Sequence, residues 1–146
     1  MMLLSRQALF AVAAVVDVAM HARPLPVAAK ALAARHDLPP RRLETLLQAL
    51  VRSQILKSVR GPRGGYELAR ERRRISVADI VRAALEAGDT ETEGSPLIVA
   101  VIGPLVQEAG ETMLKALEAI SVEALCLEAS RKTRPTADAP AMDFTI

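Results

Sequence analysis

The sequence predicts a mainly α-helical fold with one short two-stranded β-hairpin and a long C-terminal helix. Half of the 146 residues are apolar while only 2% are aromatic, and the abundance of Ala and Leu favours helices. Apolar residues recur at three- and four-residue steps along most of the chain, and one glycine-rich segment, residues 60–65, joins two short β-type runs. A chain of this length suits one compact domain with an appendage.

Three helices are expected ahead of the hairpin. The first, over residues 3–21, lacks Gly and Pro and is apolar nearly all round, so other elements must cover it on more than one side. The second covers residues 27–36, and residues 37–39 form a tight turn after it. Pro40 suits the first position of the third helix, which runs to about Ser53, because its missing N–H would be unpaired there anyway.

The third helix has one apolar and one polar face. Leu43, Leu46, Leu47 and Leu50 fall on the apolar side. The polar side can donate hydrogen bonds to guanine or phosphate and accept them from cytosine, through the side chains of Arg41, Arg42, Glu44, Thr45, Gln48 and Arg52. Taken alone, these residues fit equally well the solvated face that every surface helix has. The face is therefore a candidate base-reading surface.

Two short β-type runs, residues 55–59 and 66–69, follow this helix. The turn between them places two basic side chains among small or rigid residues: Arg60, Gly61, Pro62, Arg63, Gly64 and Gly65. Its tip can lie along phosphates or in a narrow minor groove, which attracts arginine. A helix pair with a three-residue turn and a basic hairpin predicts a winged helix-turn-helix over residues 1–87, whose third helix enters the major groove of double-stranded DNA.

Charge is distributed unevenly along the chain. Residues 1–82 hold 15 Lys and Arg against 6 Asp and Glu, whereas residues 83–146 hold 4 against 11. The first part has a net charge of +9 and the second of −7, which indicates that the first part binds a polyanion. Two alternatives remain open, an uneven surface without function and a winged helix that contacts only other proteins. Basic residues on both the helix and the hairpin favour DNA.

The region after the hairpin begins with a helix and an acidic loop. A capping-box-like start at residues 76–79 predicts a helix to about Glu86. Residues 88–96 form an acidic, breaker-rich loop that marks a boundary. At the other end of the chain, residues 131–146 have little core potential and are expected to be a flexible tail.

Between the acidic loop and the tail, residues 97–130 predict a long amphipathic helix and a short following helix. Gly103 and Pro104 are expected to bend or restart the long helix near its beginning. Its apolar seam needs a partner surface and is expected to form a homodimer interface through Ile102, Val106, Ala109, Met113, Leu117 and Ile120.

Several classes of protein are disfavoured by the residue types present. Cys126 is the only cysteine, so there is no disulfide framework, Cys-rich zinc site or Cys-x-x-Cys pair, which fits a reducing cytoplasm. Cys126 is either a small buried hydrophobe or a functional thiol, which would act as a redox sensor or form an intersubunit disulfide. Asp17 interrupts the first apolar run well short of the ~20 residues that a membrane span needs, so no membrane partner is expected. No nucleophile–base pair, metal-ligand set or P-loop is present, so an enzyme is not expected.

Three segments resemble one known family. Residues 43–50, residues 57–69 with their Val-Arg-Gly-Pro-x-Gly-Gly-Tyr order, and residues 75–83 are similar to the Rrf-two family of winged helix-turn-helix transcription regulators. The resemblance implies a homodimer whose long C-terminal helices cross, and a DNA operator with two half-sites. It also implies that Glu44 and Arg60 read bases and that the protein acts as a repressor.

The chain departs from this family at two places. Many relatives have Ser and an aromatic residue at the start of the third helix, where this chain has Pro39, Pro40, Arg41 and Arg42, so the target sequence is expected to differ. Many relatives also hold an iron–sulfur cluster with three cysteines in the loop before the long helix, whereas residues 86–104 contain neither Cys nor His. We therefore expect no iron–sulfur cluster and no bound metal. An unknown small-molecule effector is left open as the signal.

Overall fold

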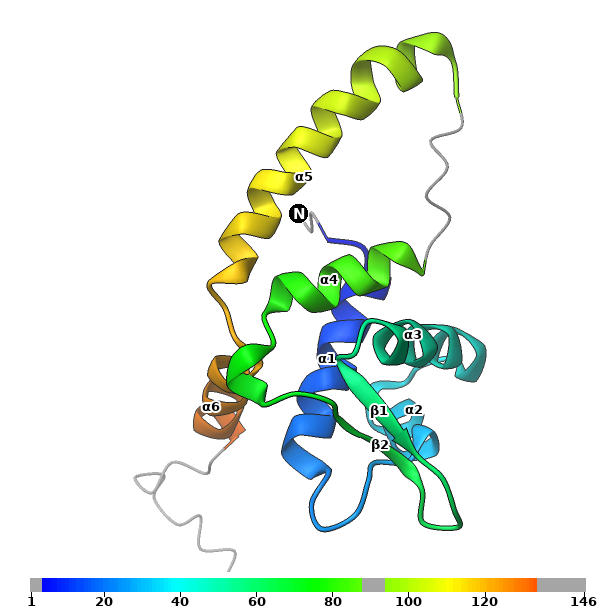
Figure 1. The fold of residues 1–146 in the computed structure, drawn as a ribbon, viewed down its shortest axis with the longest axis vertical. Helices are drawn as coiled ribbons and strands as arrows, with labels where there is room; N and C mark the ends of the chain where they lie inside the picture. Colours follow the sequence, from blue (N-terminus) through cyan, green and yellow to red (C-terminus); the bar gives the residue numbers. More distant parts are fainter. Residues whose placement is uncertain (1–3, 88–93, 134–146) are drawn as a thin grey trace, which may run out of the picture.

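The computed structural model of the protein describes residues 4–87 and 94–133 (Figure 1). The elements follow in the order α1 (Arg6–His21), α2 (Ala29–His36), α3 (Pro40–Arg52), β1 (Leu56–Val59), β2 (Gly65–Leu68), η1 (Arg72–Arg74), α4 (Val77–Glu86), η2 (Ile98–Ile102), α5 (Gly103–Glu118) and α6 (Val122–Thr133). This confirms the predicted fold class, mainly α-helical with a two-stranded antiparallel wing and a long C-terminal helix. Most of the predicted acidic loop, residues 88–96, and of the predicted tail lies outside the described residues, although residues 131–133 belong to α6.

α1 runs through the middle of the domain (Figure 1). Ser5 caps its N-terminus by accepting a hydrogen bond from the Ala8 N–H at 3.2 Å. The helix packs against α2, α3, α4, α6 and β2. Many of its buried side chains are small, among them Ala11 and Ala14, so that these neighbours can approach closely. The expectation that this apolar helix is covered on more than one side is confirmed.

α2 begins two residues later than the sequence predicts, at Ala29. Val27 is extended instead and forms an antiparallel bridge with Tyr66, with hydrogen bonds of 3.0 Å from Val27 N to Tyr66 O and 2.8 Å from Tyr66 N to Val27 O. Gly65 makes this bridge possible, because a Cβ there would overlap the Val27 carbonyl. The bridge ties the wing to the segment between α1 and α2.

α3 directs its leucine stripe into the core, as predicted. Pro40 occupies the first turn of the helix, and Leu43, Leu46, Leu47 and Leu50 are buried. The helix packs against α1, α2, α4 and β1, and each buried leucine stabilises the fold by about 1.5–3 kcal/mol. The tight turn before α3 places Asp37 in the left-handed conformation, with φ 51°. The polar face of α3 is therefore held outward by a fully packed apolar face.

α4 and the last part of the chain are joined by backbone hydrogen bonds. The capping box is confirmed, since Ser76 Oγ accepts from Asp79 N at 3.1 Å and Asp79 Oδ2 accepts from Ser76 N at 3.0 Å. A bridge between Ser76 and Ser121 adds bonds of 2.8 Å from Val77 N to Ile120 O and from Val122 N to Ile75 O. The end of α5 and the first half of α6 thus pack onto the domain formed by the first four helices.

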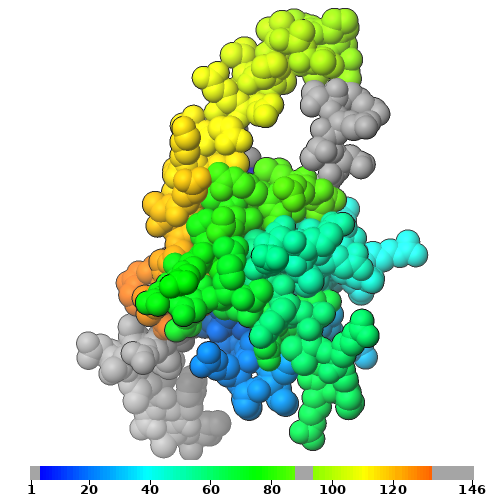
Figure 2. All heavy atoms as spheres, viewed as in Figure 1, coloured from blue at the N-terminus to red at the C-terminus, as the bar shows by residue number. Residues whose placement is uncertain are grey.

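The start of the C-terminal helix stands away from the domain (Figures 1 and 2). A break was predicted at Gly103 and Pro104, and the chain there forms η2, a widened π-helical turn in which Gly103 N–H bonds to Ile98 O. Pro104 cannot donate to the preceding turn, which explains why the helix changes form at this point. None of the helices within residues 4–87 and 94–133 is long and apolar enough to cross a membrane.

Candidate nucleic-acid interface

The outer face of α3 presents the predicted base-reading side chains to solvent. Arg41, Arg42, Glu44, Gln48 and Arg52 are all exposed. They span the helix from its first to its last turn and lie opposite the buried leucine stripe. A helix of this width fits the major groove of B-DNA, where guanine offers two acceptors and cytosine one amino donor. The face can therefore supply both donors and an acceptor to base edges.

Thr45 is partly committed within its own helix. Its Oγ1 donates a hydrogen bond to the Arg41 carbonyl at 3.1 Å, a common contact of threonine with the preceding turn. The hydroxyl is exposed and keeps its lone pairs. Thr45 can accept a hydrogen bond from a base in this arrangement, but it cannot also donate one.

The wing is an antiparallel pair in which Leu56 faces Leu68 and Val59 faces Gly65. Its tip carries the predicted residues Arg60, Gly61, Pro62, Arg63 and Gly64, with both arginines exposed. Gly61 has φ 119°, a conformation that favours glycine, and its carbonyl accepts from Gly64 N at 2.9 Å. A Cβ on Gly64 would overlap the Val59 carbonyl. Gly61 and Gly64 thus fix a tight tip that displays two arginines.

The arginines of α3 and the wing tip differ from most other arginines in their pairing. Arg35, Arg70, Arg73, Arg82 and Arg131 each form an ion pair. In the part of the chain that the structure describes, no carboxylate pairs with those of α3 and the tip, which are Arg41, Arg42, Arg52, Arg60 and Arg63. Unpaired cations on one surface are what a phosphate backbone requires.

A buried carboxylate, which the residue pattern did not identify as a site, joins α2 to α1. Asp17 of α1 is 4% exposed and receives a bidentate hydrogen bond from Arg35, with Nε at 2.7 Å and Nη2 at 2.6 Å. Nε2 of His36 lies 2.8 Å from its Oδ2 and Nδ1 of His21 lies 3.3 Å from its Oδ1. Both histidines of the chain therefore meet at Asp17.

This cluster fixes α2 against α1. Burial by itself would raise the pKa of Asp17, but the hydrogen bonds from Arg35 and His36 and the nearby positive charges hold it below its ordinary value. Asp17 is therefore a carboxylate at neutral pH. Its only signal in the sequence is an acidic residue within an apolar run, and partners 18 and 19 residues away are not visible from such a pattern.

Cys126 lies inside the contact between α6 and the rest of the domain. Its side chain is buried, and burial raises the pKa of the thiol despite the opposing effect of the Arg72 guanidinium. A protonated, inaccessible thiol reacts slowly with oxidants. These features favour the interpretation of Cys126 as a small buried hydrophobe over that of a redox sensor.

The residues of the predicted dimer seam fall into two environments. The first three, Ile102, Val106 and Ala109, are exposed on η2 and α5. Met113 is half-buried, and Leu117 packs against the core close to the buried Leu114. Ile120 follows α5 and is 38% exposed. The first half of the seam is therefore directed away from its own domain, whereas Met113 and Leu117 are partly covered by it.

Known proteins that are similar in sequence to this chain are named as transcription regulators. The Rrf2 model, described as an iron-dependent transcriptional regulator, matches residues 4–128. The chain belongs to the Rrf2 family. This Rrf2 protein is 38% identical over 88 residues to the HTH-type transcriptional regulator IscR of Xenorhabdus nematophila, a match that covers 60% of the chain and 54% of that relative. The chain thus spans about half the length of such curated relatives, and the predicted resemblance is confirmed.

Solved structures agree with this Rrf2 assignment over most of the chain. The structure of T. potens IscR matches with a TM-score of 0.71 and 31% identity, covering 92% of this chain and 93% of that one. CymR, the global cysteine regulator of B. subtilis, matches with a TM-score of 0.64 and 24% identity over 88% and 98% of the two chains. The second likeness shows the fold alone. Both include the winged helix-turn-helix and the long C-terminal helix within the part that they cover.

Proposed function

We propose that this Rrf2 protein is a homodimeric, sequence-specific DNA-binding regulator of transcription that acts on operators with two half-sites. One observation carries the proposal: all five arginines of α3 and the wing tip lack an ion pair with any carboxylate of the described residues. A winged helix that contacts only proteins has no need of unpaired arginines on both elements. A DNA backbone neutralises them directly.

Docking follows from the shape of the two elements. α3 enters the major groove, where Glu44 accepts from a cytosine amino group and Arg41 or Gln48 reaches a neighbouring base. The wing lies beside the same half-site, and Arg60 and Arg63 contact the flanking backbone or the minor groove. The bridge between Val27 and Tyr66 and the Asp17 cluster hold the wing and α2 in the positions that this docking needs.

An exposed apolar surface supports the homodimer. Leu105 and Val106 are 63% and 65% exposed, and five further large apolar side chains are exposed just before them: Leu97, Ile98, Val99, Val101 and Ile102. Soluble monomers seldom present such a continuous apolar surface. A second copy would cover it by a symmetric contact and would place two α3 helices on two half-sites. We also propose repression, which the resemblance to the family implies.

Changing Glu44 to Ala tests the base-reading role. We expect this variant to lose discrimination at one operator position, by about 1–3 kcal/mol, with little change in its affinity for scrambled DNA. The measurement is competition binding of the variant to operators substituted one base pair at a time, selected beforehand from a random pool. Glu86→Ala, an exposed change at the end of α4, is the control. An equal loss for operator and scrambled DNA would contradict base reading by Glu44.

The residues of this chain do not fit an iron–sulfur cluster held by three cysteines. The only thiol, Cys126, is buried in α6, and within residues 4–87 and 94–133 no group of His, Cys, Asp or Glu side chains is arranged to hold a metal. We therefore expect protein purified without oxygen to show no iron-dependent absorption band in the visible range. Such a band, together with stoichiometric iron and sulfide, would overturn this part of the proposal.

A further inference from the structure

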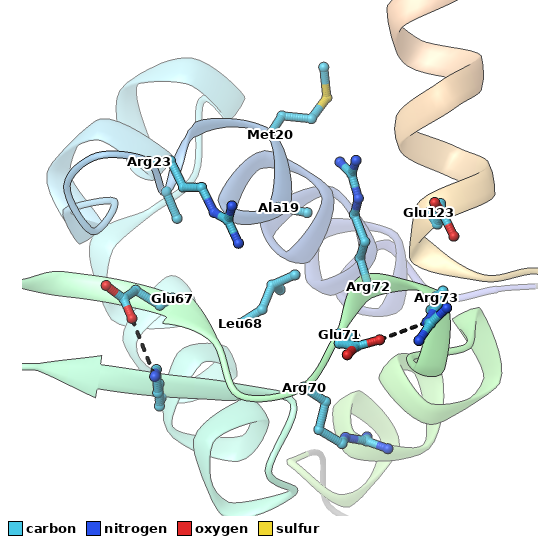
Figure 3. Close-up of a pocket in the computed structure, with 12 residues that line it drawn as sticks. Ala19, Met20, Arg23, Glu67, Leu68, Arg70, Glu71, Arg72, Arg73 and Glu123 are labelled. Atoms are coloured by element: carbon cyan, nitrogen blue, oxygen red, sulfur yellow. Dashed lines mark hydrogen bonds and ion pairs between the residues drawn. The ribbon is translucent and has the colours of Figure 1, made fainter.

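A cavity of about 720 Å³ lies between the C-terminal end of α1, the wing, η1 and α6 (Figure 3). Ala19, Met20, Ala22 and Leu68 give it an apolar part. A volume of this size is typical of sites that bind small molecules. No residue proposed to contact DNA lines it, so the cavity is separate from the proposed interface.

Half of the charged lining of the cavity is paired within the lining itself. It consists of Arg23, Lys57, Arg70, Arg72 and Arg73 and of Glu67, Glu71 and Glu123. Lys57 lies 3.4 Å from Glu67 and Arg73 lies 2.6 Å from Glu71. Arg70 donates to the Gln54 carbonyl at 3.2 Å and lies 3.8 Å from Asp79. Five cations and three carboxylates leave the lining with a net positive charge.

Among the described residues, Arg23, Arg72 and Glu123 are the charged lining groups without an ion pair, so two guanidinium groups outweigh one carboxylate. The neighbour of Arg72 is the thiol of Cys126, which is neutral. In Figure 3 the guanidinium groups of Arg23 and Arg72 lie on either side of Ala19, and Leu68 lies below them. Guanidinium groups bind carboxylates and phosphates through two parallel hydrogen bonds. The geometry suits a molecule with an acidic group at each end and a short body between them.

We propose that this cavity binds a small organic dianion, and that its occupation weakens DNA binding. Only the second half of this inference rests on the proposed function. The cavity touches β1 through Lys57, β2 through Leu68 and α6 through Glu123, so an occupant contacts the wing and the C-terminal part together. A bound dianion also lowers the positive charge of the DNA-binding part and draws Arg23 and Arg72 together.

Binding is tested first without DNA, using citrate and inorganic pyrophosphate as probes at constant ionic strength. We expect calorimetry to detect at least one of them with a dissociation constant below about 1 mM. Arg23→Gln and Arg72→Gln should each weaken that binding by about tenfold or more, because each removes one guanidinium. Arg74→Gln is the matched control, since Arg74 belongs to the same arginine triplet but does not line the cavity. Absence of binding by both probes, or an equal loss in Arg74→Gln, would overturn the site.

The effect on DNA is then measured with the same probe and a selected operator. Saturating probe should raise the operator dissociation constant of the wild type by about fivefold or more, and the Arg23→Gln, Arg72→Gln double variant should lose this response. An equal response in wild type and double variant would contradict coupling through the cavity. If the two changes weaken DNA binding but leave probe binding intact, the arginines contact DNA phosphates and the inference is wrong. If the wild type binds the probe but binds no DNA, the proposed function is refuted and the cavity site stands.

Discussion

Val106→Asp is expected to give a folded monomer whose operator affinity is lower by about 100-fold or more, because a monomer contacts only one half-site. Val106 is 65% exposed in the protomer, so Asp is hydrated there and the protomer keeps its stability. In the dimer the same position becomes buried and would hold two unpaired carboxylates across the symmetry axis. Light scattering reports the mass and a titration with selected operator reports the affinity.

The control for this experiment is Gln107→Asp, which introduces the same charge one residue away at an exposed polar position. It should keep both the dimer and the operator affinity. Leu117→Asp is a poorer test than the sequence pattern suggests, since Leu117 packs against the core of its own protomer. A stable Val106→Asp dimer with unchanged affinity would show that the exposed surface of η2 and α5 is not the dimer interface.

Asp17→Asn is expected to lower the free energy of unfolding by about 2–4 kcal/mol. The amide has nearly the shape of the carboxylate, but it cannot accept both hydrogen bonds from Arg35 and it carries no charge to meet His21 and His36. Urea denaturation measures the change. Asp37→Asn, at an exposed position that tolerates Asn in the left-handed conformation, should be nearly neutral.

The dependence on pH gives this experiment a second readout. The pKa of Asp17 is lowered in the folded state. Its contribution to the free energy of unfolding is therefore fully present above the pKa of the unfolded state, about 4, and is lost as the pH falls through the lower pKa of the folded state. The difference in stability between wild type and Asp17→Asn should therefore be present at pH 7 and shrink below about pH 4. A difference that persists unchanged at pH 3 would mean that the carboxylate charge is not what stabilises the contact.

Features set by neighbouring residues were predictable from the sequence. The boundaries of α3 follow from Pro40 and the leucine spacing, and the start of α4 follows from the capping box of Ser76 and Asp79. The wing tip follows from its glycines, because Gly61 adopts a positive φ and Gly64 approaches the backbone of Val59. In each case the controlling interaction lies within a few residues.

Features that depend on distant residues were not predictable. The sequence around Val27 would also allow the following helix to begin there. The antiparallel bridge to Tyr66 is what places Val27 in a β conformation. Asp17 gains its role from side chains on the next helix. Leu114 was not among the residues of the predicted dimer seam, yet its side chain is the buried one through which α5 contacts the domain. Such contacts require the relative positions of the helices, which periodicity within one segment does not contain.

Salt dependence of binding to a selected operator tests the central claim most directly. If the five arginines of α3 and the wing tip in each protomer meet DNA, at least half of these ten cations in the dimer should neutralise phosphates. The logarithm of the association constant should then fall linearly with the logarithm of the salt concentration, with a slope of about −5 or steeper, and scrambled DNA should bind far more weakly at each concentration. A slope near zero, or equal affinity for selected and scrambled DNA, would contradict a sequence-specific DNA-binding regulator.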